Sequence, residues 1–187
     1  MLIVKPITKA IKHDKITFKQ VTDLYRSAFP RQEQAPLAFI INQTKRDTVA
    51  FRTFYDDDIF VGFAYTMTFG DVTYLWYLAV RKDIRAKGYG SKIMKYLKDE
   101  YADNRIVLNL DVQDENAPDC EIRKKRKNFY AKNGYSPAKF KCNFNRNELD
   151  VVCINGEVSA DEFLSVFKDY FGAVGYFFYK PKIIFPN

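Results

Sequence analysis

The residues that could do chemistry start with a basic loop that carries two glycines, Arg85-Ala86-Lys87-Gly88-Tyr89-Gly90-Ser91. Glycine allows positive φ and lets a ligand approach the main chain, while Arg85 and Lys87 add positive charge. When a helix starts directly after such a loop, its first free amides point at an anion. The loop therefore predicts a site for a polyphosphate. Its spacing matches neither a Walker loop nor the dinucleotide fingerprint, which needs a third glycine.

Two elements must position this loop, a strand before it and a helix after it. Residues Val72–Val80 are rich in β-branched and aromatic side chains, which favours a buried strand. Ile93, Leu97 and Tyr101 recur at the spacing of one helical face, which predicts a helix that covers Lys92–Leu97. The expected unit is a strand, an anion-binding loop and a helix.

Upstream of this unit, the pattern predicts helices followed by an antiparallel meander. Thr17 and Gln20 form a capping box, and the helix that they open should stop at Phe29-Pro30, because the residue before a proline avoids the α region. The other expected elements are a strand at Leu2–Thr8, a polar connection at Lys9–Lys15, a short helix at Leu37–Gln43, and strands at Thr48–Tyr55 and Ile59–Thr68.

Downstream, a strand at Ile106–Val112 follows the helix, so the right-handed crossover rule predicts parallel pairing with Val72–Val80. A capping box at Ser159 and Glu162 opens a helix to about Phe171. The aromatic segment beyond it is costly to expose, so we expect it to pack on the body or on a second subunit. The remaining elements are a loop at Gln113–Asp119, a helix at Glu121–Lys132 closed by Asn133-Gly134, and strands at Ser136–Asn143 and Glu148–Ile154 joined across Asn145-Arg146-Asn147.

The composition is that of a folded, basic protein of one domain. The chain has 187 residues, of which 47% are hydrophobic and 17% aromatic, and this excludes a disordered chain. No apolar run is long enough to cross a membrane and no signal peptide is evident, so we expect a cytoplasmic protein. Cys120, Cys142 and Cys153 form no close metal-ligand pair, and we expect reduced thiols and no metal. The net charge of +7 suggests an anionic partner.

The element order and two motifs resemble the GNAT superfamily of acetyl-CoA-dependent N-acetyltransferases, over about residues 1–154. The loop Arg85–Gly90 resembles the pyrophosphate signature of that family, and Phe129-Tyr130-x-x-x-Gly134-Tyr135 is similar to the end of its second conserved helix. The segment Ser27–Pro36 is similar to a group of small bacterial members. The resemblance implies an α/β (α+β) fold with a mixed, mostly antiparallel central sheet, flanking helices and splayed central strands. Residues 155–187 would pack on the same domain as a helix and an aromatic tail.

The resemblance also implies a site for acetyl-CoA. Backbone donors of the strand would bind the pantetheine arm and the thioester carbonyl, and the loop amides would bind the pyrophosphate. The residues implied in cofactor binding are Leu78, Ala79, Val80, Arg85, Ala86, Lys87, Gly88, Tyr89, Gly90 and Ser91. Tyr130 corresponds to the general acid of the family, because a phenol with an ordinary pKa near ~10 stays protonated at neutral pH. It also lies on the apolar face of its helix, so a role in the core is the alternative.

The base that accepts the amine proton is not marked by a histidine. Glu33 is favoured as catalytic base, because the loop between the first two helices lines the acceptor groove in the family, while Asp111, Glu115 and water remain open. Arg123 and Arg126 stand where many members carry Asn and Ala, which places the usual Asn contact to the cofactor in doubt.

The expected function is transfer of an acetyl group from acetyl-CoA to a primary amine by direct attack in a ternary complex. The acceptor is a small molecule or a peptide, and polyamine, antibiotic, amino acid, protein N-terminus and lysine remain open. A nucleic-acid-binding module using Arg123–Lys127 is disfavoured, because aromatic residues do not alternate with that basic run. A non-catalytic acyl-CoA sensor is a further alternative. No membrane partner is expected, and a homodimer through the C-terminal segment stays open.

Overall fold

The fold is described from a computed structural model, which describes residues 2–144 and 147–185. The chain divides into two compact units, each of which is described by itself. The first unit contains the described residues up to Met67 together with Leu75–Glu100. The second contains Thr68–Tyr74 and the described residues from Tyr101 onward. The expected boundary between residues 1–154 and 155–187 stays a prediction.

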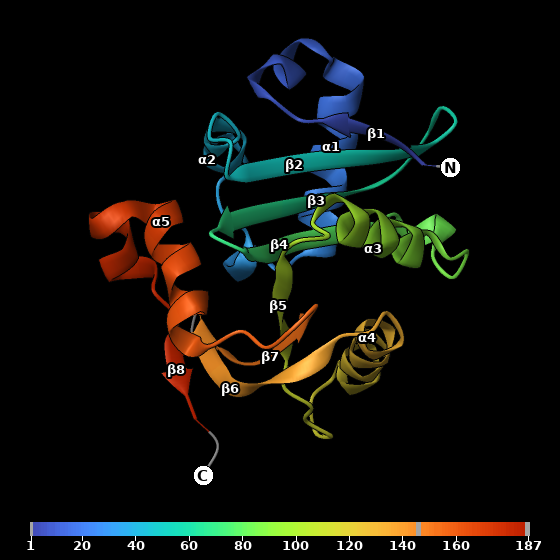
Figure 1. The fold of residues 1–187 in the computed structure, drawn as a ribbon. Helices are drawn as coiled ribbons and strands as arrows, with labels where there is room; N and C mark the ends of the chain where they lie inside the picture. The colour runs from blue at the N-terminus through green and yellow to red at the C-terminus, as the bar shows by residue number, and fades with distance from the viewer. Residues whose placement is uncertain (1, 145–146, 186–187) are drawn as a thin grey trace. The chain divides into compact units, whose positions relative to one another are not determined.

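Strands and helices alternate along the chain in a mixed pattern (Figure 1). The strands are β1 (Ile3–Pro6), β2 (Val49–Asp56), β3 (Ile59–Phe69), β4 (Val72–Val80), β5 (Arg105–Asp111), β6 (Ser136–Phe144), β7 (Asn147–Ile154) and β8 (Lys182–Ile184). The α-helices are α1 (Lys15–Ala28), α2 (Leu37–Gln43), α3 (Tyr89–Glu100), α4 (Cys120–Lys132) and α5 (Ala160–Tyr179). Short 3₁₀ helices cover Lys9–His13, Arg31–Glu33 and Lys82–Ile84.

The described strands pair in the order β1-β2-β3-β4-β5-β7-β6-β8, and the β4–β5 pair is parallel. This arrangement confirms the expected mixed, mostly antiparallel sheet with helices. Among the described residues, the β4–β5 ladder covers Val72↔Arg105, Thr73↔Ile106 and Tyr74↔Val107. Strand β4 itself continues from Tyr74 to Val80.

Aromatic side chains build the core of the first unit on both faces of β2 and β3. The ring of Phe51 meets the ring of Phe63 edge-on at 5.4 Å, and Tyr25 of α1 lies 6.3 Å from Phe63. On the other face, the ring of Phe54 lies 5.3 Å from that of Tyr96 of α3. Helices α1 and α3 therefore cover opposite faces of these strands (Figure 1).

The start of α1 differs from the sequence prediction. Asp14 is the N-cap, and its carboxylate accepts a hydrogen bond from the Thr17 amide at 3.0 Å. The predicted capping box at Thr17 and Gln20 is wrong, because a charged acceptor three residues earlier binds the free amide more strongly. The Thr17 hydroxyl instead lies 3.1 Å from the Tyr55 hydroxyl. The predicted stop is confirmed, because the helix ends at Ala28 and Phe29 is extended.

In the second unit, helices α4 and α5 pack against opposite faces of β5, β7 and β6. The rings of Phe140 and Phe163 lie 5.5 Å apart, which places α5 on the face of β6 that carries Phe140. Lys127 of α4 lies 3.7 Å from Asp150 of β7. Asp150 is opposite Lys141 in the β6–β7 ladder, and Lys141 follows Phe140, so its side chain points to the other face. Helix α4 therefore lies on the face away from Phe140.

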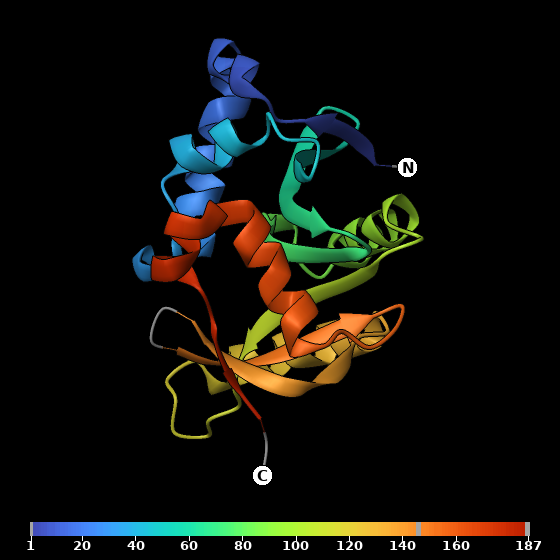
Figure 2. The same ribbon diagram turned by 60° about the vertical axis from the view of Figure 1, so that its left-hand side comes forward.

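Helix α5 has two segments that meet at Gly172, where φ is 65° (Figure 2). The predicted helix end near Phe171 coincides with this kink, but the helix continues to Tyr179. Strand β8, which pairs with β6, was not predicted. None of the described helices is long and apolar enough to cross a bilayer. The predicted turn residues Asn145 and Arg146 lie outside the described residues.

Candidate functional site

The glycine loop opens α3 with a backbone suited to an anion. Helix α3 begins at Tyr89, three residues earlier than predicted, so Tyr89, Gly90 and Ser91 form its first turn. Ala86 and Gly88 have φ of 64° and 80°, in the left-handed region. The first amides of a helix have no acceptor within it, and left-handed residues before them turn successive N–H groups into a concave surface. The loop is therefore able to hold a polyphosphate.

Side chains hold this loop against its own unit. The Tyr89 hydroxyl donates to Asp56 Oδ2 at 2.6 Å, and this carboxylate raises the pKa of Tyr89. The ammonium group of Lys92 lies 5.0 Å from the centre of the Tyr89 ring. Arg85 Nε donates to the Val80 carbonyl at 3.2 Å, and Lys87 is exposed. The first turn of α3 is thus anchored while the basic side chains remain at the surface.

Strand β4 directs alternate amides to one edge. The Arg81 amide donates to the Val61 carbonyl of β3 at 3.0 Å, so the amides of Leu78 and Val80 point to the opposite edge. The side chains of Trp76, Leu78 and Val80 are half-buried, whereas Ala79 is buried. Beyond Tyr74 this edge lies outside the described β4–β5 ladder. The amides of Leu78 and Val80 therefore point to the edge of β4 opposite β3.

A glycine in β3 brings that strand unusually close to β4. A Cβ built on Gly62 would lie 2.1 Å from the Ala79 carbonyl oxygen and 3.1 Å from Val80 Cα. Such a separation is far below van der Waals contact, so the spacing of the strands here requires glycine. This role was not predicted, because a single glycine inside an apolar strand does not show that the backbone of a neighbouring strand lies against it.

Glu33 lies in the 3₁₀ helix between α1 and α2, which is held by two tyrosines. The Tyr77 hydroxyl donates to the Glu33 carbonyl at 2.7 Å and accepts from the Ala35 amide at 3.1 Å. The Tyr25 hydroxyl donates to the Ala35 carbonyl at 2.9 Å. Burial raises the pKa of Tyr77, so its hydroxyl stays protonated. Tyr77 packs in the core and also positions the loop, a role that the sequence did not distinguish from packing.

Tyr130 is buried on α4, with aromatic neighbours. Its ring lies 5.1 Å from Phe129 and 5.6 Å from Tyr135, both edge-on. Burial raises the pKa of Tyr130 to about 12, with nearby Arg126 acting in the opposite direction. The phenol is therefore protonated at neutral pH. Tyr130 belongs to the second unit, whereas Glu33, Leu78–Val80 and the glycine loop belong to the first.

The basic run on α4 is largely used in ion pairs within its own unit. Arg126 lies 2.7 Å from Asp111, Arg123 lies 2.8 Å from Asp119, and Lys127 lies 3.7 Å from Asp150. Arg123 also donates to the Val112 carbonyl at 3.1 Å. These contacts fasten α4 to the end of β5 and to β7. They favour a structural role for the run over a nucleic-acid surface, and they give Asp111 a cationic partner.

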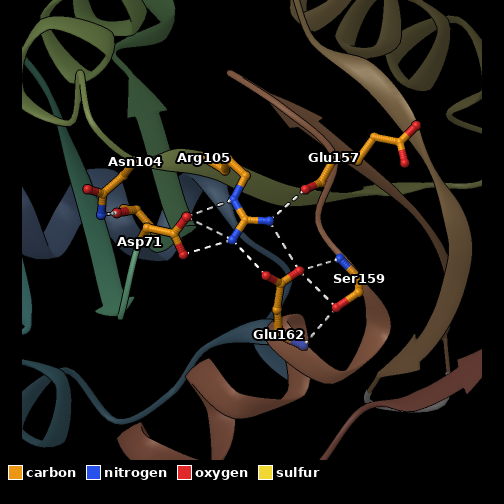
Figure 3. Close-up of polar contacts among 7 residues, drawn as sticks. Asp71, Asn104, Arg105, Glu157, Ser159 and Glu162 are labelled. Atoms are coloured by element: carbon orange, nitrogen blue, oxygen red, sulfur yellow. Dashed lines mark hydrogen bonds and ion pairs between the residues drawn. The ribbon is translucent and has the colours of Figure 1, made fainter.

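Arg105 joins three segments at the paired end of β4 and β5 (Figure 3). Its guanidinium lies 2.7 Å from Asp71, before β4, and 2.7 Å from Glu162 of α5. It also donates to the Glu157 carbonyl at 2.7 Å. The bond to Arg105 is the largest factor that lowers the pKa of Glu162 to about 2. This network fixes the first residue pair of the β4–β5 ladder, Val72↔Arg105.

The side chain of Asn109, on β5, has no hydrogen-bond partner among the described residues. Neither the oxygen nor the nitrogen of the Asn109 amide has a hydrogen-bond partner among the described residues, and both atoms are buried. Asn109 is on β5 opposite Val151 of β7. The alternation Leu108-Asn109-Leu110 in the sequence predicted a strand but not an unpaired amide inside it.

In the mixed sheet, a glycine loop and helix α3 connect the two parallel strands β4 and β5. The family model described as "Acetyltransferase (GNAT) family" matches residues 18–135. The chain therefore belongs to the GNAT family of acetyltransferases, which use acetyl-CoA. A search of curated proteins found no match.

Solved structures share the fold at low sequence identity. A protein of Bacteroides thetaiotaomicron assigned to the GNAT family has a TM-score of 0.71 and 21% identity, and the match covers 92% of this chain and 98% of that one. An aminoglycoside 6'-N-acetyltransferase complexed with coenzyme A has a TM-score of 0.62 and 21% identity, covering 81% and 94%. The ribosomal-protein-S18-alanine N-acetyltransferase of Escherichia coli has a TM-score of 0.59 and 16% identity, covering 86% and 97%.

Proposed function

We propose that this acetyltransferase moves the acetyl group of acetyl-CoA directly to a primary amine while both substrates are bound. The observation that carries the proposal is the sequence of donors along one stretch of the first unit. The amides of Leu78 and Val80, which point away from β3, are followed along the chain by the left-handed loop and by the amides of the first turn of α3. This order suits a long ligand with an acyl group at one end and a pyrophosphate at the other.

Acetyl-CoA supplies an activated acyl group, because the thioester carbon is electrophilic and the thiol is a good leaving group. The amides of Leu78 and Val80, with Ala79 between them, donate to the pantetheine arm and to the carbonyl oxygen. The amides from Arg85 to Ser91 bind the pyrophosphate, and the side chains of Arg85 and Lys87 balance its charge.

Two side chains manage the protons in this proposal. As the new C–N bond forms and the C–S bond breaks, Glu33 accepts the proton of the attacking amine and Tyr130 gives its proton to the sulfur. Burial raises the pKa of Tyr130 to about 12, so its phenol is protonated at neutral pH. Asp111 is a weak candidate for the base, because its carboxylate is paired with Arg126 at 2.7 Å.

The acceptor is a primary amine on a small molecule or a peptide. Support for this class comes from the relatives with the same fold, of which one acetylates an aminoglycoside and another an alanine of ribosomal protein S18. An acetyl-transfer screen over polyamines, aminoglycosides, amino acids and peptides, with release of the free thiol as readout, identifies the acceptor.

Calorimetric titration with acetyl-CoA tests the cofactor site. Gly88→Trp should abolish binding, because position 88 has φ of 80° and lies among the loop amides. Gly70→Trp is the matched control, since Gly70 also has a positive φ of 59° in open space, in a turn far along the chain from the loop. Wild-type protein that does not bind acetyl-CoA, or Gly88→Trp protein that binds as wild type does, would refute the proposal.

A further inference from the structure

The second segment of α5 exposes its apolar side chains, whereas the first segment buries its own. In the first segment, Phe163, Val166, Phe167 and Tyr170 are buried. Val174 and Phe177 continue the same helical spacing, four and seven residues after Tyr170. Yet Val174 is 77% exposed and Phe177 is 76% exposed. A straight helix would carry these side chains onto the same face as the buried stripe.

The kink at Gly172 is what turns this face outward. Gly172 has φ of 65° and ψ of 174°, a conformation that side-chain-bearing residues rarely adopt. Phe178, one position further, is 72% exposed and its ring meets that of Phe177 edge-on at 5.3 Å. We call Val174, Phe177 and Phe178 the α5 surface. The later part of the tail, Lys182–Ile184, pairs with β6 as strand β8.

The size of the α5 surface is that of an interface core. Aromatic side chains cover roughly 150–250 Å² each, so these residues and the half-exposed Tyr179 present roughly 500 Å² of apolar area. The largest apolar patch of a monomeric protein is about 300–600 Å² and is often functional, and a stable interface needs about 800 Å² on each partner. The α5 surface thus supplies most of one side of a stable interface.

Strand β8, which follows α5 in the sequence, offers a second element that could pair with another chain. It follows α5 after two residues and pairs with Asn143, Cys142 and Lys141 of β6 along one edge. It is the last strand in the order of the described strands, so its other edge offers backbone donors and acceptors. An edge strand and an apolar helix face that are neighbours in sequence suit an isologous contact, in which the same elements meet across a two-fold axis.

We propose that the α5 surface and the outer edge of β8 form the interface of a homodimer of this chain. The segment Gly172–Tyr179 contains no charged residue, so it lacks the basic polar face by which a helix lies on an anionic membrane. A second copy instead offers an identical apolar surface of the same size. The proposal is independent of the acetyl acceptor and of the roles of Glu33 and Tyr130.

Light scattering coupled to size exclusion, from low to high micromolar protein, tests the proposal. Wild-type protein should have the mass of two chains. The double variant Phe177→Glu with Phe178→Glu should have the mass of one chain, because its dimer dissociation constant rises by at least roughly 100-fold. Val174→Arg should weaken the dimer on the same face. The matched control replaces two exposed apolar residues elsewhere, Ile16→Glu with Ile122→Glu, and should remain dimeric.

Circular dichroism and acetyl-CoA titration separate this result from misfolding and from loss of function. The Phe177→Glu with Phe178→Glu variant should keep the helix content and the acetyl-CoA affinity of the wild type. A wild-type protein of single-chain mass at all concentrations overturns the proposal. So does a double variant that remains dimeric. Binding of a monomeric wild type to vesicles of phosphatidylcholine and phosphatidylserine, lost in the double variant, would assign the α5 surface to a membrane and also overturn it.

Discussion

The hydroxyl of Tyr77 donates to the carbonyl oxygen of Glu33 across 44 positions of sequence, at 2.7 Å. The same hydroxyl accepts from the Ala35 amide, so one side chain from strand β4 satisfies two backbone groups in the loop that carries the proposed base. Strand β4, with the proposed donors for the acyl group, and the loop with the proposed base are thereby held together within the first unit.

Tyr77→Phe should loosen this loop. The substitution leaves the Glu33 carbonyl and the Ala35 amide without that partner, which costs about 1–3 kcal/mol of stability. The Michaelis constant for the amine should rise, while acetyl-CoA affinity changes little. Tyr65→Phe is the control, because Tyr65 also donates one hydrogen bond, to the Ile40 carbonyl at 3.2 Å. It should lower the unfolding temperature without a change in the Michaelis constant for the amine.

Tyr130→Phe should lower kcat by about 10²-fold, the usual contribution of a positioned general acid, and leave acetyl-CoA affinity unchanged. Because burial raises the pKa of Tyr130 to about 12, the wild-type rate should not fall between about pH 8 and 10 through loss of this proton. Tyr135→Phe removes the same atom from the neighbouring ring. Its hydroxyl is buried without a partner among the described residues, so that variant should keep full activity. Unchanged turnover in Tyr130→Phe would assign Tyr130 to packing.

Glu33→Gln should lower kcat/KM for the amine by about 10²-fold near neutral pH. The deficit should shrink as the pH approaches the pKa of the acceptor amine, because the amine then arrives already deprotonated. Steady-state kinetics over a range of pH measures both effects. Glu115→Gln serves as comparison, because Glu115 is one of the alternative candidates for the base, and this variant should behave as wild type. A deficit that is the same at every pH would assign Glu33 to binding of the acceptor.

The stability of the protein at acid pH should depend on the hydrogen bonds and ion pairs of Arg105. The pKa of Glu162 is lowered from its ordinary 4.5 to about 2, chiefly by Arg105, so the folded state favours the ionised carboxylate. This stabilisation is complete above about pH 4.5 and is lost as the pH falls toward about 2. Glu162→Gln should flatten the dependence of unfolding temperature on pH in that window. Glu157→Gln is the control, because its side chain is 76% exposed and pairs with the surface residue Lys139.

Local patterns predicted much of the fold. Helix α2 and strand β4 have the predicted bounds, because each is set by adjacent residues: prolines before α2, and a run of β-branched and aromatic residues in β4. The glycine loop was found for the same reason, since glycine and basic residues are informative within a few positions.

Features that depend on distant residues were missed. The carboxylate of Asp14 displaced the predicted Thr17 cap, and the Thr17 hydroxyl meets Tyr55 instead. The contact of Tyr77 with Glu33 joins segments that no local pattern connects. The helix predicted to end at about Phe171 instead continues past a kink at Gly172 into a second helical segment, which ends at Tyr179.

The missing side chain at Gly62 has a consequence for catalysis. The Ala79 carbonyl, which faces Gly62, belongs to the same peptide group as the Val80 amide, which points to the opposite edge. Because a peptide group is planar, a methyl group at position 62 would tilt the carbonyl and the amide together. Gly62 of β3 thus controls the orientation of the Val80 amide, the donor proposed for the thioester oxygen, from the opposite edge of β4.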